Sequence, residues 1–243
     1  ILFIDITDAK LLERSKSELV AVASHQLRTP LTAMRGNVEM LIDESFGALN
    51  KEQHELLDDI NVSTIRLITM VNEMLDITKI EKGNLDMKLE VLDVTEIIDS
   101  VISDLSTYAE RHEFKIVTGP HASRVAVTAD RVRIRQIFQN LIDNAIKYSR
   151  YPGELAILTS VSGAFVEIAF ADNGIGVPKN EQSKLFGRFY RASNTAKTAS
   201  SGSGLGLYIV KSIAKQFGGD ISFTSEENVG TTFKVTLPLA NDQ

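Results

Sequence analysis

The first third of the chain repeats apolar residues in steps of three and four, the spacing of an amphipathic α-helix. Between residues 10 and 43 only Pro30 and Gly36 interrupt the pattern, which predicts one long helix. Its apolar stripe includes Leu27, Leu31, Met34, Val38 and Leu41. A loop is expected at 44–50, and a second helix over 51–81. The heptad positions of the second helix are Leu57, Ile60, Thr64, Leu67, Val71, Met74 and Thr78.

Two long helices joined by a short loop predict an antiparallel hairpin. A single hairpin leaves one side of its apolar stripes uncovered, and pairing two hairpins into a four-helix bundle covers it. We therefore expect a homodimer through residues 10–82. The alternative is a hairpin that packs on the second domain of its own chain.

Residues 2–7 form a short β-like run ahead of the hairpin, and a lone strand is not stable by itself. The Asp-Ile-Thr ending of this run resembles the exit of PAS sensor domains. Residues 1–9 are therefore expected to be the end of an upstream sensor domain and its linker, the alternative being a disordered terminus. Because the chain starts at Ile1 rather than Met, we expect a longer protein, with any membrane anchor upstream.

After Gly83 the pattern changes to short β-like runs that alternate with helices, which predicts an α/β domain over residues 84–243. The expected fold is a mixed sheet with helices on one face. No Walker motif is present. Strands are expected at 85–94, 114–118, 125–129, 155–161, 164–171, 220–225 and 231–237. Helices are expected at 95–111, 131–148, 205–217 and near 178–186.

Composition narrows the possible functions. The chain has 243 residues, 43% of them hydrophobic, which is enough to build a core. Its net charge of −6 argues against a nucleic-acid surface, because phosphate binding requires clustered Lys and Arg. The absence of cysteine excludes disulfides, thiolate catalysis and Cys-based zinc sites. No apolar run is long enough to span a bilayer. The expected location is the cytoplasm, either for a free protein or for the cytoplasmic part of a membrane-anchored sensor.

One histidine in the first helix has unusual surroundings. His25 stands in Ser-His-Gln-Leu-Arg-Thr-Pro-Leu, residues 24–31, one turn before Pro30. A proline inside a helix costs about 3 kcal/mol and leaves the backbone before it partly unbonded. Three other histidines lack such surroundings, and we read them as ordinary surface or structural residues.

This octet resembles the phospho-acceptor box of sensor histidine kinases of two-component systems. The family pattern has a glutamate where this chain has Gln26. Residues 75–83 also resemble the exit of the family's dimerisation hairpin. The resemblance implies that residues 10–83 form a dimerisation and phosphotransfer domain and that His25 is phosphorylated. Gln26, Arg28 and Thr29 would form the catalytic surroundings of His25.

Four segments of the second half carry the chemistry of a nucleotide site. The first places Asn140, Asn144, Lys147 and Tyr148 on one helical face, where amide oxygens suit Mg²⁺ and a lysine suits phosphate. The second is Asp-Asn-Gly-Ile-Gly at 172–176, a turn after a strand whose carboxylate can accept an adenine amine. Each segment also has an ordinary explanation, as a polar helix face or a common turn.

The third segment is Phe-Gly-Arg-Phe-Tyr-Arg at 186–191, with arginines suited to a γ-phosphate. The fourth is Gly-Ser-Gly-Leu-Gly-Leu at 202–207, which runs directly into an apolar helix. Free amides at a helix N-terminus favour phosphate. Alone, each of these segments is a weak signal.

In this order, the four segments resemble the boxes of the ATP-binding domain shared by histidine kinases, gyrase, the Hsp90 chaperone and MutL. The resemblance implies that Asn144 ligates Mg²⁺, that Lys147 and Tyr148 contact phosphates or ribose, and that Asp172 binds adenine. Arg191 and the loop 190–204 would close over the triphosphate. The full set of implied ATP-binding residues is Asn140, Asn144, Lys147, Tyr148, Asp172, Gly174, Gly176, Arg188, Arg191, Gly202, Gly204, Leu205 and Gly206.

The expected reaction is attack of His25 on the γ-phosphate of Mg·ATP, followed by transfer to an aspartate on a response regulator receiver domain. Gln26 can accept a hydrogen bond from the imidazole but cannot take its proton, so a slower autokinase is expected. Thr29, at the family position that orients a hydrolytic water, favours an additional phosphatase activity. The alternatives are an ATP-hydrolysing conformational machine and an inactive dimeric scaffold. Hydrolysis is disfavoured, because the ATPase relatives have a glutamate that activates water at the position of Asn140. The amide of an asparagine cannot act as that base.

Overall fold

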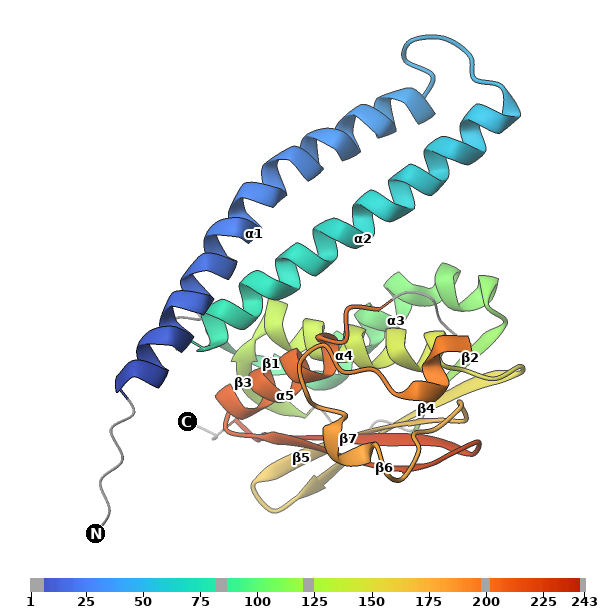
Figure 1. Ribbon diagram of the computed structural model, residues 1–243. Coiled ribbons are helices and arrows are strands. Elements are labelled where there is room, and N and C mark those ends of the chain that lie inside the picture. The colour runs from blue at the N-terminus through green and yellow to red at the C-terminus, as the bar shows by residue number, and fades with distance from the viewer. Residues whose placement is uncertain (1–6, 82–86, 120–124, 198–201, 241–243) are drawn as a thin grey trace. The chain divides into compact units, whose positions relative to one another are not determined.

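The computed structural model describes residues 7–81, 87–119, 125–197 and 202–240. The chain divides into two compact units, Ile1–Leu85 and Asp86–Gln243 (Figure 1). The fold class agrees with the expectation, since a helical hairpin precedes an α/β domain with a mixed sheet.

The first unit is the predicted hairpin of α1 (Thr7–Ile42) and α2 (Lys51–Glu81). Helix α1 continues through Pro30. At the start of α2, Asn50 and Gln53 each bond the backbone N–H of the other, at 2.9 and 2.8 Å, a reciprocal cap that ends the loop. The strand expected at residues 2–7 lies outside the described residues except for Thr7, which is already helical.

The apolar stripe of the hairpin is divided between two faces. On the face between the helices, Ser24, Val38, Thr64, Val71 and Thr78 are buried at the spacing of a helical seam. Several other positions of the stripe are about half exposed, namely Leu27, Met34 and Leu41 on α1 and Ile60 and Leu67 on α2, whereas Leu31, Leu57 and Met74 are partly buried. The single hairpin therefore leaves part of the predicted stripe uncovered.

The second unit is a five-stranded sheet in the order β2-β4-β5-β7-β6, with a separate β1-β3 ribbon. The strands are β1 (Leu89–Asp93), β2 (Phe114–Thr118), β3 (Ala126–Asp130), β4 (Gly153–Ser162), β5 (Phe165–Asp172), β6 (Asp220–Glu226) and β7 (Gly230–Pro238). Strands β2 and β4 are parallel, and the other paired strands of the sheet are antiparallel.

Three helices, α3 (Val94–Arg111), α4 (Arg131–Lys147) and α5 (Gly206–Gln216), cover one face of this sheet (Figure 1). Strand side chains alternate accordingly, with Leu155, Ile157, Ile168 and Val235 fully buried under the helices. Helix α4 lies in the middle and contacts both α3 and α5. The core therefore fixes α4, the element that carries the first candidate segment.

One predicted helix is wrong. The stretch near 178–186 contains only a 3₁₀ turn, η1 (Gln182–Lys184). The amide of Gln182 donates to the carbonyls of Val177 at 3.1 Å and Ser225 at 2.9 Å, which ties this segment to β6. The buried residues of this segment, Pro178 and Leu185, still have a helical spacing, so the pattern of the sequence alone could not exclude a helix.

Candidate nucleotide and phosphotransfer sites

The phospho-acceptor segment lies within α1. His25 follows the buried Ser24, and its side chain is outside the described part of the structure. Gln26, Arg28 and Thr29 are exposed. The guanidinium of Arg28 donates to Oδ1 of Asn72 from Nε at 3.1 Å and from Nη2 at 2.7 Å. Arg28 therefore joins this segment of α1 to α2, a structural contact that its sequence position did not reveal.

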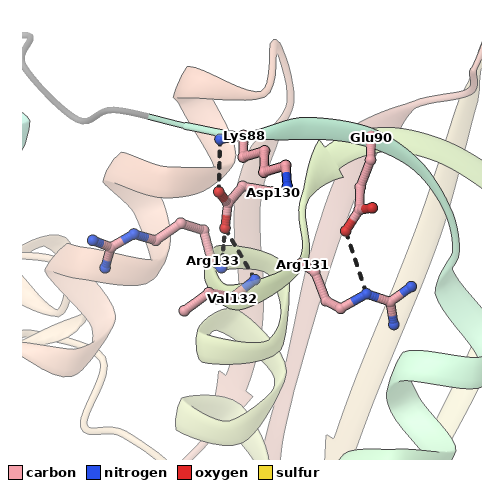
Figure 2. Close-up of polar contacts among 6 residues, drawn as sticks. All are labelled: Lys88, Glu90, Asp130, Arg131, Val132 and Arg133. Carbon is pink, nitrogen blue, oxygen red and sulfur yellow. Dashed lines mark hydrogen bonds and ion pairs between the residues drawn. The ribbon is translucent and has the colours of Figure 1, made fainter.

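The start of α4 is set by Asp130, whose carboxylate bonds both to the first turn of the helix and to the segment before β1 (Figure 2). Its Oδ1 accepts the backbone N–H groups of Val132 and Arg133, each at 3.0 Å. Its Oδ2 accepts the N–H of Lys88 at 2.8 Å, next to β1. This N-cap fixes where α4 begins, and so it fixes which residues of α4 reach the candidate site.

The C-terminal half of α4 carries the predicted amide and lysine residues. Asn140 donates from Nδ2 to the carbonyl of Gln136 at 2.9 Å, and a Cβ at Gly206 would lie 2.5 Å from its Oδ1. Asn144 is partly exposed, and its side chain makes no hydrogen bond to any described residue. Lys147 pairs with Asp143 at 2.5 Å. Asn140 therefore contacts the start of α5, and the amide of Asn144 is left available to a ligand.

Asp172 stands at the end of β5 and is largely buried. Its Oδ1 accepts the N–H groups of Gly174 at 2.9 Å and Thr231 at 3.1 Å. Burial raises the pKa of Asp172, and the two backbone hydrogen bonds act in the opposite direction. Among the described residues, no group donates a hydrogen bond to Oδ2. The carboxylate is thus held in place by one oxygen, with the other free to accept from a ligand.

Tyr148, the C-cap of α4, connects the four segments. A Cβ on Gly174 would lie 2.5 Å from the Tyr148 carbonyl, so only glycine fits beside it. A Cβ on Gly202 would lie 3.5 Å from the Tyr148 hydroxyl and 3.9 Å from Cζ of Arg191. The structure therefore brings the end of α4, the Asp172 turn, Arg191 and the glycine segment together.

The glycine segment also contacts the aromatic segment. Gly204 has a φ of +72°, and a Cβ there would lie 2.7 Å from the backbone carbon of Phe189. Leu205 is fully buried and is the N-cap of α5, where it gives the helix no side-chain cap; its own N–H donates to Oγ of Ser203 at 3.1 Å. Arg188 points to α5, where it donates to the hydroxyl of Tyr208 at 2.9 Å and lies over its ring. The start of α5 thus keeps uncapped amides beside Asn140.

The sequence analysis did not identify Glu181, which holds the loop around Tyr190 and Ser193. Glu181 accepts hydrogen bonds from Tyr190 Oη at 2.8 Å, Ser193 N at 2.8 Å and Ser193 Oγ at 2.6 Å. The bonds from Ser193 are the main reason why its pKa is lowered. Nearby, Asn194 donates to the carbonyl of Gly176 at 3.0 Å. No short-range pattern could reveal these contacts, because the partners are separated by loops.

Two known families match separate parts of the chain. Residues 15–83 match the His Kinase A (phospho-acceptor) domain. Residues 129–241 match the histidine kinase-, DNA gyrase B- and HSP90-like ATPase family. The chain belongs to the sensor histidine kinases of two-component systems, with an ATP-binding domain of that ATPase family.

Two curated relatives show the extent of the similarity. An uncharacterised sensor-like histidine kinase of Rhizobium meliloti (strain 1021) is 35% identical over 92% of this chain and 43% of its own length. The sensor histidine kinase WalK of Bacillus subtilis (strain 168) is 32% identical over 98% of this chain and 39% of its own. The chain thus spans less than half of either relative.

Two solved structures share the fold. Full-length ShkA in complex with AMPPNP aligns with a TM-score of 0.75 at 26% identity, over 93% of this chain and 46% of that one. The mycobacterial sensor histidine kinase MprB aligns with a TM-score of 0.53 at 28% identity, over 62% of this chain and 98% of that one. Within the described residues, no helix has the length and apolar character needed to cross a membrane.

Proposed function

We propose that this chain phosphorylates itself on His25 with ATP and then passes the phosphoryl group to an aspartate on the receiver domain of a response regulator. Residues 10–83 would act as the dimerisation and phosphotransfer domain, and residues 84–243 as the catalytic domain. The observation that carries the proposal is the convergence of Asp172, Tyr148, Arg191 and the α5 N-terminus in a chain that also carries the acceptor segment. Since ATP is the donor, the reaction belongs in the cytoplasm.

The nucleotide domain offers a distinct group for each part of ATP. Oδ2 of Asp172 would accept the exocyclic amine of adenine, because Oδ1 is already occupied by two amides. The uncapped amides at Gly206 and the positive end of the α5 dipole suit phosphate. Arg191 lies beside Gly202, from where it would reach the triphosphate.

The residues present also suit a magnesium ion held mainly by the nucleotide. No group of three or more His, Cys, Asp or Glu side chains forms a metal cluster among the described residues. The amide of Asn144 is a hard oxygen ligand with no competing hydrogen bond to a described residue. Asn144 would hold Mg²⁺ against the phosphates, where the ion would neutralise charge during transfer.

The chemistry at His25 is an in-line displacement. An N–P bond forms at one ring nitrogen as the bond between the γ-phosphorus and the ADP oxygen breaks, and the proton on the other ring nitrogen passes to water. Gln26 is exposed beside His25 and can orient the ring through its amide oxygen, but it cannot accept the proton. The phosphoryl group then moves to the aspartate carboxylate, and the histidine regains a proton.

The uncovered apolar positions of the hairpin support a homodimer through residues 10–82. Leu27, Met34 and Leu41 recur every seven residues on α1, and Ile60 and Leu67 do so on α2. This heptad spacing suits packing against a second hairpin in a four-helix bundle. The dimer would bury side chains that the single hairpin leaves about half exposed.

The test is incubation of the protein with γ-labelled ATP, followed by mapping of the labelled residue. We expect an acid-labile label on His25 and none in His25→Ala. A label on another residue, or none in the unmodified protein, contradicts the proposal. Mixing His25→Ala with Asn144→Ala chains then tests the direction of transfer. A label in the mixture indicates transfer between protomers, and its absence indicates transfer within one.

Thr29 supports a second activity at the same segment, removal of phosphate from the receiver domain. Thr29 is exposed one helical turn after His25, a position from which its hydroxyl can hold a water. Thr29→Ala should lower the rate of receiver dephosphorylation while autophosphorylation is retained. Equal loss of both rates would contradict a separate role for Thr29.

A further inference from the structure

The loop that carries Asp172, residues 172–176, packs against the turn between β6 and β7, residues 226–230. The N–H of Asn228 donates to the carbonyl of Ile175 at 2.8 Å. A Cβ on Gly176 would lie 2.0 Å from the carbonyl oxygen of Glu226, so the two backbones are in direct contact. The position of this turn therefore sets the position of the loop.

The same turn also contacts Asp172 itself. A Cβ on Gly230 would lie 2.1 Å from the carbonyl oxygen of Asp172. Thr231, directly after the turn, supplies one of the two N–H groups that hold Oδ1. A shift of the turn would therefore move the carboxylate that is proposed to bind adenine.

Arg150 holds the turn with a bidentate contact. Its Nη1 donates to the backbone carbonyl of Asn228, and its Nη2 donates to Oδ1 of the same residue, both at 2.6 Å. The planar guanidinium suits such a double contact, whereas a lysine could make only one bond at a time. Asn228 has a φ of +67°, a conformation that asparagine tolerates better than most residues. Both residues are exposed, so neither serves to fill the core.

The contacts form a closed ring. The carbonyl of Tyr148 accepts the N–H of Ile175 at 3.0 Å, on the other side of the loop from Asn228. Arg150 follows Tyr148 by two residues and returns to Asn228. The Ile175 segment is thus held between the end of α4 and the β6–β7 turn, and Arg150 closes the ring.

We propose that Arg150 and Asn228 are positioning residues that fix the Asp172 loop for adenine and so set the preference for ATP over GTP. The inference rests on the proposed function, in which Asp172 accepts the exocyclic amine. Guanine carries a carbonyl oxygen at that position, which a carboxylate repels. Loosening the loop therefore weakens ATP binding, while GTP binding, which gains nothing from Asp172, stays nearly constant.

The test measures nucleotide dissociation constants for Arg150→Gln, Arg150→Lys and the control Arg111→Gln, which removes an exposed arginine at the end of α3. Arg150→Gln should weaken ATP binding about tenfold, because only about a tenth of the molecules would then hold the Asp172 loop in its binding position. The Lys variant should recover part of this loss. GTP affinity, the melting temperature and the labelling rate at saturating ATP should stay near the values of the unmodified protein.

Three outcomes contradict the inference. They are an unchanged ATP affinity in Arg150→Gln, an equal loss of ATP and GTP affinity, and a loss that follows a lower melting temperature. Asn228→Gly offers a second route, because it permits the left-handed φ and keeps the backbone acceptor while it removes Oδ1. It should weaken ATP binding about threefold, with less than additive loss when combined with Arg150→Gln.

Asp172→Asn separates this inference from the function on which it rests. If Asp172→Asn leaves ATP affinity unchanged, the proposed base site is wrong. If Asp172→Asn weakens ATP binding but Arg150→Gln does not, the base site stands and only the positioning role fails.

Discussion

The hairpin and the nucleotide domain hold their functional residues in different ways. In the hairpin, Gln26 and Thr29 are exposed on a regular helix, and their surroundings follow from helical spacing. In the nucleotide domain, residues far away in sequence hold the site: backbone groups contact Asp172 and Gly176, and the side chain of Asn140 contacts Gly206. Most substitutions on the exposed side of the hairpin should therefore leave its function intact, as long as His25 and the apolar positions of the proposed dimer interface are kept. In the nucleotide domain, small changes should impair binding.

The largest expected change is the loss of ATP affinity when Asp172 is substituted. Asp172→Asn should weaken ATP binding roughly 10- to 100-fold, because a charged acceptor of the adenine amine is lost. Isothermal titration with ATP measures this change. An affinity within twofold of the unmodified protein would show that the carboxylate does not bind the base.

The same substitution should stabilise the domain without nucleotide. Burial raises the pKa of Asp172, so the folded state disfavours its ionised form. A raised pKa means that stability increases as the pH falls through the folded-state pKa and is lost as the pH rises through it. The gain in melting temperature of Asp172→Asn should therefore be greatest near neutral pH and shrink towards acid. A lower melting temperature at neutral pH would contradict this account.

The second effect concerns the exposed stripe of the hairpin. Leu67→Asp should convert the dimer to monomer at micromolar concentration, because burying two unpaired carboxylates in the bundle is costly. Light scattering measures the mass. Val62→Asp is the matched control, since Val62 is also exposed but lies on the other side of α2. A Leu67→Asp protein that remains dimeric would place the dimer interface elsewhere.

A third comparison makes one substitution in both regions. Gly36→Ala lies inside α1 with nothing within 4 Å, so it should stabilise the hairpin by about 1 kcal/mol. In Gly206→Ala the new Cβ would lie 2.5 Å from Oδ1 of Asn140. We expect it to destabilise the domain by about 1–3 kcal/mol and to weaken ATP binding. Thermal unfolding of both variants checks the contrast, and two changes of the same sign would contradict it.

The smallest expected effect is at Gln26. Gln26→Glu places a carboxylate beside His25 that can take the imidazole proton, so the initial rate of labelling should rise by about two- to tenfold. Nucleotide affinity should not change, because Gln26 lies in the hairpin. A variant that is labelled more slowly than the unmodified protein would contradict a base role at this position.

The elements were predictable where local spacing determined them. The two hairpin helices and most strands follow from periodicity alone, and the strand Phe114–Thr118 has the predicted bounds. The helix expected near 178–186 failed, because side-chain bonds from Gln182 to distant carbonyls decide the shape of that segment. The division of the hairpin stripe into a buried and an exposed face also needed the packing of α1 against α2.

By itself, the sequence determined which chemical groups this protein has and roughly where they lie along helices and strands. It supplied the histidine before Pro30, the asparagines of α4, the carboxylate after β5 and the glycines before α5. Only the tertiary structure decided which groups meet. Tyr148 meets Gly174 and Gly202, Asn140 meets Gly206, and Arg150 closes a ring through Asn228. The physical reason is that these contacts join backbone and side-chain atoms across the sheet and its loops, where sequence spacing carries no distance information.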